Sequence, residues 1–160
     1  MLRPSGLAFL AVLTGCHAAR PPDCNLVAKQ ASGCIQRFEG ARDERRMLLA
    51  CFPFSEPVRI RGAWVSGFEL NSFFEGAEAS ADLLRFELTP NPDPRDVRVS
   101  NYATLVFGPK AGPSLAPDDG KIRLLQVDLI GRREICPILP PVHTIVVDRL
   151  LSASIRGVTA

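Results

Sequence analysis

The chain of 160 residues has few of the side chains and motifs that enzymes use at their active sites. It contains two histidines, one tryptophan and one tyrosine, and no Gly-x-Ser-x-Gly turn, phosphate-binding glycine loop or Cys-x-x-Cys pair. Nucleophilic catalysis and nucleotide chemistry are therefore not predicted. We expect no catalytic residue, no cofactor and no metal.

The sequence also lacks a concentration of charge of one sign. Acidic and basic residues are interspersed, and the formal net charge at neutral pH is +2. Domains that bind nucleic acid gather lysine and arginine on one stretch or face, and no such run is present. The sequence predicts no nucleic-acid partner and implies no other polyanion.

The first fifteen residues have the layout of a secretory signal. One positive charge, Arg3, precedes an apolar run from Gly6 to Leu13 that is followed by small residues. A helix that spans a bilayer needs about 20 apolar residues, so this run is too short for a stable transmembrane helix. Residues 1–15 are predicted to be a signal peptide that is removed.

The end of this segment, Leu13-Thr14-Gly15-Cys16, resembles the lipobox of bacterial lipoproteins. That resemblance implies cleavage before Cys16, a lipid on its thiol and a fatty acid such as palmitate on the new amino terminus, which together give a stable anchor. His17 replaces the aspartate that retains enteric lipoproteins in the inner membrane, so the resemblance favours the outer membrane, facing the periplasm. The alternative is an ordinary secretory signal cut after Ala18 or Ala19.

Four further cysteines, Cys24, Cys34, Cys51 and Cys136, are an even number for an oxidising compartment and predict two disulfides. Of the three possible pairings we favour Cys24 with Cys34 and Cys51 with Cys136. A zinc site at Cys136 and His143 is the alternative. No second pair of closely spaced ligands accompanies them, so a metal site is not predicted.

Alternation of apolar and polar residues from Val58 onward predicts strands. Gly62 and Gly67 interrupt the first candidate, as glycines do at bulges and bends of a curled sheet. Before Val58, residues 20–30 are polar and predict a tether, and residues 35–50 predict one short helix. The strand candidates span residues 58–69, 68–74, 83–88, 101–107, 121–131 and 143–155.

Strands separated by proline-rich loops predict a mainly β fold, either a small antiparallel barrel of five or six strands or a sandwich, with one short N-terminal helix. The segments VRIRGAWVSGFELNSFF, KIRLLQVDLIGRR and HTIVVDRLLS resemble small uncharacterised bacterial envelope proteins. That resemblance implies an OB-like barrel and no particular activity. The predicted organisation is a signal peptide over 1–15, a lipid-anchored tether over 16–33 and a single β domain over 34–160.

Three residues are candidate ligand contacts: Trp64, Glu69 and Phe74. Glu69 follows the predicted bend at Gly67, and it either forms a structural ion pair or contacts a ligand. Trp64 and Phe74 belong to an aromatic group that either fills the core or forms a stacking platform. Phe73 and Phe74 are adjacent, so in a strand they point to opposite faces, and one of them is either covered by another segment or exposed.

The sequence favours a non-catalytic, membrane-anchored envelope lipoprotein that acts as a binding or structural module, with a protein partner in the envelope. Its specificity is expected in the long loops 89–101 and 108–120. One alternative is an enzyme that acts on envelope polysaccharide or peptidoglycan through two of the carboxylates Glu69, Glu75, Glu87 and Asp128. The other is a binder of a small ligand or sugar, which requires an open pocket.

Overall fold

The computed structural model describes residues 21–40, 43–67, 70–89, 102–108, 119–138 and 142–159. The predicted signal peptide, Cys16 and Glu69 lie outside these ranges, as does most of both predicted binding loops. The described elements are, in chain order, α1 (Cys24–Gln36), α2 (Glu44–Cys51), β1 (Val58–Gly67), β2 (Leu70–Glu75), α3 (Ala81–Glu87), β3 (Tyr102–Val106), β4 (Ile122–Arg133) and β5 (His143–Thr159).

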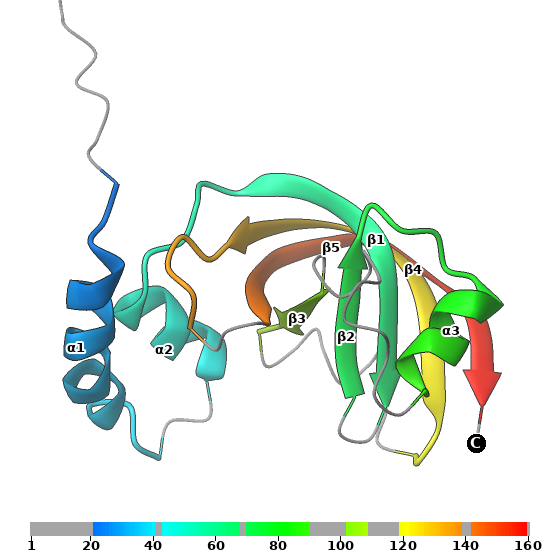
Figure 1. The fold of residues 1–160 in the computed structure, drawn as a ribbon, viewed down its shortest axis with the longest axis horizontal. Helices are drawn as coiled ribbons and strands as arrows, with labels where there is room; N and C mark the ends of the chain where they lie inside the picture. The colour runs from blue at the N-terminus through cyan, green and yellow to red at the C-terminus, as the bar shows by residue number, and fades with distance from the viewer. Residues whose placement is uncertain are drawn as a thin grey trace, which may run out of the picture.

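The five strands close into a barrel in the order β1-β2-β3-β5-β4 (Figure 1). The prediction of a small five-stranded barrel is therefore confirmed, and the sandwich alternative is wrong. The prediction that all strands are antiparallel is wrong at one place, because β3 and β5 pair in parallel. A closed ring with an odd number of strands cannot alternate direction throughout, so one parallel pair is required.

Large apolar side chains fill the barrel interior, where they form one cluster. Trp64 lies in this cluster and its indole Nε1 donates a hydrogen bond to Asn71 Oδ1 at 3.0 Å. Asn71 in turn donates through Nδ2 to the Leu105 carbonyl oxygen at 2.8 Å and so bridges β2 and β3 beyond their short ladder. The buried polar atoms are thus paired, as a stable interior requires.

Gly62 does not mark the predicted bulge, because β1 pairs with both neighbours without a register shift. Close packing is the reason for the glycine: a Cβ at this position would lie 2.3 Å from the Phe74 carbonyl oxygen. The register shifts lie between β4 and β5, where the pairing skips Asp148, Leu151 and Arg156. Such bulges bend a strand and re-aim side chains.

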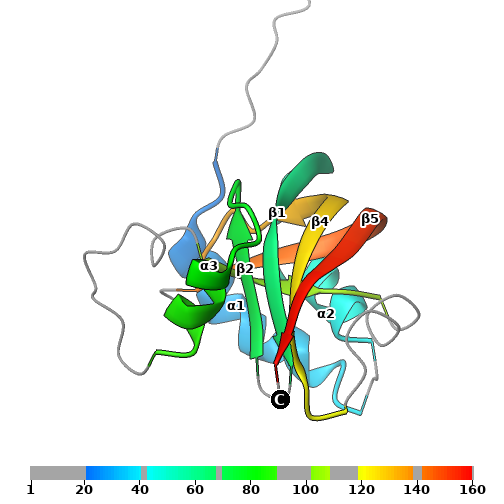
Figure 2. The same cartoon turned by 90° about the vertical axis from the view of Figure 1, so that its right-hand side faces the viewer.

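Residues 83–88, predicted as a strand, form most of helix α3 instead. Ser80 caps the helix by accepting a hydrogen bond from Leu83 N–H, and Asp82 lies favourably in the first turn. Leu83 is buried against the outer face of the barrel in a second apolar cluster. The helix covers part of the sheet (Figure 2), and the apolar spacing of Leu84 and Phe86 fitted a strand only by coincidence.

Two helices, α1 and α2, lie beyond one end of the barrel (Figure 1), where the sequence predicted one helix over 35–50. Gly40 has a φ of 81°, a left-handed conformation that glycine tolerates, and it separates them. Asp43 caps α2 through the Arg46 N–H, and Leu48 packs on Val106 and Val146 of the barrel. Within the described ranges, no helix has both the length and the apolar character to cross a membrane.

All four predicted cysteines form disulfides, but the favoured pairing is wrong: Cys24 bonds Cys136 and Cys34 bonds Cys51. Cys24 and Cys34 both lie in α1. Ten residues of helix separate them by about 15 Å, well beyond the roughly 7 Å that a disulfide permits between Cα atoms. The predicted tether over 16–33 also differs from the structure, because α1 begins at Cys24 and is bonded to the segment after β4.

Candidate binding site

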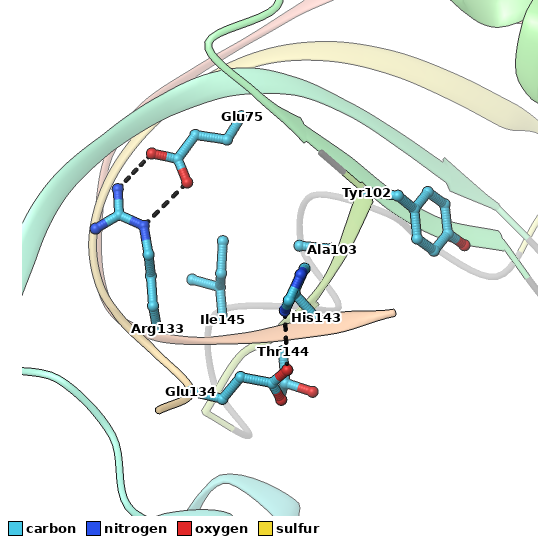
Figure 3. Close-up of a pocket in the computed structure, with 8 residues that line it drawn as sticks. All are labelled: Glu75, Tyr102, Ala103, Arg133, Glu134, His143, Thr144 and Ile145. Atoms are coloured by element: carbon cyan, nitrogen blue, oxygen red, sulfur yellow. Dashed lines mark hydrogen bonds and ion pairs between the residues drawn. The ribbon is translucent and has the colours of Figure 1, made fainter. Parts of the chain in front are cut away.

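A pocket of about 480 Å³ opens where four strands of the barrel begin or end. Glu75 ends β2, Tyr102 begins β3, Arg133 ends β4 and His143 begins β5. Ala103 and Ile145 line it between the charged groups, as Figure 3 shows. The remaining lining residues are Glu134 and Thr144. The volume lies within the range of ordinary small-molecule sites.

An ion pair between Arg133 and Glu75 forms one wall of the pocket. The guanidinium donates through Nε to Glu75 Oε2 at 3.0 Å and through a second nitrogen to Glu75 Oε1. Two parallel hydrogen bonds fix the planes of both groups. The hydrogen bond to Glu75 raises the pKa of Arg133. Both side chains stay partly exposed, so the pair presents fixed donors and acceptors to the pocket.

The opposite wall holds a second acid–base pair, Glu134 and His143. His143 Nδ1 lies 3.1 Å from Glu134 Oε1, and the Glu134 side chain is 3% exposed whereas that of His143 is 58% exposed. Glu134 also accepts a hydrogen bond from Ile138 N–H at 3.4 Å. The buried carboxylate orients the ring and leaves its other nitrogen, Nε2, without a partner among the described residues (Figure 3).

Tyr102 lies at the edge of the pocket, and its hydroxyl points away from the interior (Figure 3). The hydroxyl lies 3.0 Å from Ser72 Oγ, which also donates to the carboxylate of Glu87. Burial raises the pKa of Glu87, and the hydrogen bond from Ser72 opposes that rise. This network joins the end of α3 to β2 and to Tyr102 at the start of β3.

Two of the three predicted ligand contacts lie in cores instead. Trp64 is 3% exposed inside the barrel, and Phe74 is 1% exposed beneath α3, where it packs edge-on against Phe86 and Tyr102. The alternative of core packing is therefore correct for both. Phe73 points into the barrel and Phe74 out of it, so the adjacent pair does face opposite sides, with Phe74 covered by a helix. Glu69 lies outside the described residues.

Three of the four carboxylates named for polysaccharide cleavage lie among the described residues, and these three do not gather in one cleft. Glu75 lines the pocket but is held by Arg133. Glu87, the last residue of α3, accepts a hydrogen bond from Ser72, and Asp128 lies on the outer face of β4 between Arg59 and Arg61. The second acid of the pocket, Glu134, is bound to His143. Each of these carboxylates is thus held by a hydrogen bond to another side chain.

Cys136 is not available as a ligand for the zinc site considered above with His143, because its sulfur is bonded to Cys24. Across the described ranges, no group of three or more histidine, cysteine or acidic side chains is placed to hold a metal ion. His143 belongs instead to the pocket.

The pocket itself was not predicted from the sequence. Its residues come from four strand ends that are far apart in the chain, and no local motif marks them. One signal was available: Glu134 and His143 flank the connection between the last two strand candidates, so that a β hairpin would bring them close. No protein-family model, no curated protein and no solved structure matches this chain.

Proposed function

We propose that the protein is a lipid-anchored module of the bacterial envelope that binds another envelope component, without catalysis, through the pocket at the end of the barrel. The observation that carries this proposal is the pair of fixed acid–base contacts that face each other across the pocket. Recognition of a polar ligand needs donors and acceptors held in place before binding. Arg133 holds the carboxylate of Glu75 through two parallel hydrogen bonds, which disfavours a mechanism that needs two free carboxylates.

The anchor is supported by the Leu13-Thr14-Gly15-Cys16 motif, and the oxidised cysteines are consistent with export. Intact mass of the protein extracted from membranes tests both points. We expect an acylated chain that begins at Cys16 and gains four hydrogens on reduction. A soluble chain that begins after Ala18 or Ala19 would contradict the anchor, and a Cys16→Ser variant should lose the acyl mass.

Binding at the pocket is tested with a photo-crosslinking amino acid at position 143, where the side chain is exposed at the rim, and at position 154 as the matched control. Ser154 is exposed on β5 in the half of the strand beyond the pocket. We expect one envelope component to crosslink in membranes from position 143 and not from position 154. Equal labelling from both positions, or none from either, would contradict a binding role for the pocket.

A small ligand is the second candidate, because a volume of about 480 Å³ suits one. Trp64 and Phe74 cannot stack on it, since both are buried. Arg133, Glu75 and His143 are charged or polar lining groups that remain partly exposed to it. Native mass spectrometry of the purified protein should then show an added mass that denaturation removes. An Arg133→Gln variant should lose that mass.

A further inference from the structure

The outer face of β1, β4 and β5, together with the start of α2, carries all of the excess positive charge of the protein. Figure 2 shows these three strands side by side. The strand register and two bulges place four arginines on this face, and α2 adds a fifth. They are Arg59, Arg61, Arg132, Arg149 and Arg45, and the acidic residues among them are Asp128 and Asp148.

Two aspartates each hold two of these arginines. Asp128 accepts from Arg59 at 2.9 and 2.7 Å and from Arg61 Nε at 2.9 Å. The hydrogen bond from Arg59 is the main reason that the pKa of Asp128 falls to about 2, so this acid stays charged. Each aspartate neutralises one guanidinium of its pair, and the other keeps its positive charge.

The bulge in β5 builds the second of these clusters. Asp148 is skipped by the strand pairing between Arg149 and Val147. Its carboxylate accepts a hydrogen bond from Arg132 Nε at 2.9 Å and pairs with Arg45 of α2. Arg45 is also held through Nε to the Val147 carbonyl oxygen at 3.1 Å. The helix is therefore part of the same charged face.

Five guanidinium groups against two carboxylates give this face, which we call the arginine face, a formal charge of +3. The whole chain has 19 basic and 17 acidic residues, so 14 basic and 15 acidic residues remain elsewhere. Arg61 is 63% exposed and Arg59 56%, and Arg149 has no ion pair with any described residue. The guanidinium groups are thus available to an anion.

The arginine face begins at the end of the barrel to which the N-terminal helix is bonded. Arg132 precedes Cys136 by four residues, and Cys136 holds Cys24, the first residue of α1. Cys24 lies only eight positions after Cys16, and even a fully extended chain of that length spans at most about 28 Å. An anchor at Cys16 would therefore keep the arginine face within reach of the bilayer surface.

We propose that the arginine face docks on the anionic headgroups of the membrane to which Cys16 anchors the chain. The proposal rests on the anchor argued above. Arginine binds phosphate through parallel hydrogen bonds, and basic residues close to an anionic leaflet each contribute attraction that falls off within a Debye length. Docking would fix the orientation of the barrel and of its pocket relative to the membrane.

Vesicle sedimentation with the oxidised chain of residues 17–160 tests the arginine face separately from the lipid. This chain keeps every described element and both disulfides. Vesicles of phosphatidylcholine alone are compared with vesicles that contain roughly one third phosphatidylglycerol. Three net charges near the surface should give a preference of about 100-fold for the anionic vesicles at low salt, and high salt should abolish it.

Two triple variants of equal charge locate the effect. Arg59→Gln, Arg61→Gln and Arg149→Gln together should remove the preference. Lys29→Gln, Arg37→Gln and Arg85→Gln, at exposed positions in or directly after α1 and α3, should keep most of it. Because the first variant leaves Asp128 unpaired, Arg59→Lys with Arg61→Lys serves as a charge-preserving variant that should still bind. Circular dichroism checks that each variant folds.

Equal binding to neutral and anionic vesicles would overturn the proposal, and so would an equal loss in both triple variants, which would indicate net charge alone. These outcomes are independent of the anchor. Acylation at Cys16 combined with no preference for anionic vesicles would reject the arginine face and leave the proposed function intact.

Discussion

The outer surface of the barrel has two halves that the same strands build in different ways. In one half, Ala63 and Val65 of β1 and Leu124 of β4 are buried beneath α3. In the other half, Arg59 and Arg61 of β1 and Asp128 of β4 face outward in ion pairs. A strand alternates clearly between apolar and polar only where one face is open. The apolar–polar alternation is therefore clear in the open half and weak in the covered half, although both halves belong to the same strands.

The carboxylates of the two halves show the same contrast. Burial at the end of α3 raises the pKa of Glu87, whereas hydrogen bonds from Arg59 and Arg61 lower the pKa of Asp128 to about 2. Loss of hydration dominates in the covered half, and direct pairing dominates in the open half. Substitutions in the covered half should therefore affect stability strongly, and those in the open half should affect surface interactions.

The largest effect on stability is expected from Phe74→Ala, which removes the aromatic ring that packs between the sheet and α3. Phe74 is 1% exposed and packs against Phe86 and Tyr102. Substitutions of this kind cost about 3–5 kcal/mol. Urea denaturation followed by circular dichroism measures the loss in the free energy of unfolding. A loss below about 1 kcal/mol would mean that α3 does not cover Phe74 in solution.

A smaller effect is expected from Gln126→Ala at the border between the two halves. The Gln126 amide donates to the carbonyl oxygens of Gly62 and Ala77 at 3.0 and 3.3 Å and accepts from Ala79 N–H at 2.8 Å. Removing it leaves partly buried backbone groups unpaired, at a cost of about 1–3 kcal/mol. Hydrogen exchange should show faster exchange of the Ala79 amide. Unchanged exchange would contradict the hydrogen bond from Ala79 N–H to Gln126.

The pH dependence should differ in sign between the two halves. Glu87 has a raised folded-state pKa, so its contribution to stability is present below its usual value of 4.5 and is lost as the pH rises through the folded-state pKa. Asp128 has a lowered pKa, so its contribution is present above its usual value of 3.8 and is lost as the pH falls towards 2.

Carbon-13 NMR of the two carboxyl groups measures these pKa values directly. Glu87 should titrate above its usual range, and Asp128 near 2. In the double variant Arg59→Gln and Arg61→Gln, the pKa of Asp128 should return towards 3.8, while that of Glu87 should not change. Titration of both groups in their ordinary ranges would remove the electrostatic difference between the halves.

The smallest effect on stability is expected from Arg61→Gln in the open half. Arg61 is 63% exposed, and Asp128 keeps its two hydrogen bonds from Arg59. Exposed ion pairs contribute about 0–1 kcal/mol. Denaturation under the conditions used for Phe74→Ala should show a loss below about 0.5 kcal/mol. A loss as large as that of Phe74→Ala would show that the open half is part of the core.

The strands were predictable from the sequence, and the helix that covers two of them was not. Alternation placed all five strands close to their observed positions. It failed at α3, because Leu84 and Phe86 are two residues apart and the helix is only seven residues long. The Ser80 cap was the signal for the helix. Over so short a segment, packing against the barrel decides the conformation.

The candidate site and the arginine face depend on contacts that the order of residues does not show. Charges that are evenly mixed along the chain predicted no polyanionic partner, but closure of β1 against β4 and the bulge at Asp148 bring arginines together from four elements. The disulfide pairing failed for a related reason. It depends on α1, and the polar composition of residues 20–30 predicted a tether there.

The connectivity of the two disulfides constrains the order in which the protein matures. Cys24 is the first of the four cysteines to be synthesised, and its partner Cys136 is the last. Cys34 and Cys51, which pair with each other, both emerge in between. In the export that we propose, Cys24 would therefore remain reduced, or exchange out of a premature bond with Cys34 or Cys51, until most of the barrel has followed it. Correct oxidation is thus coupled to completion of the chain, and an oxidant that acts rapidly on emerging thiols would need an isomerase to correct its products.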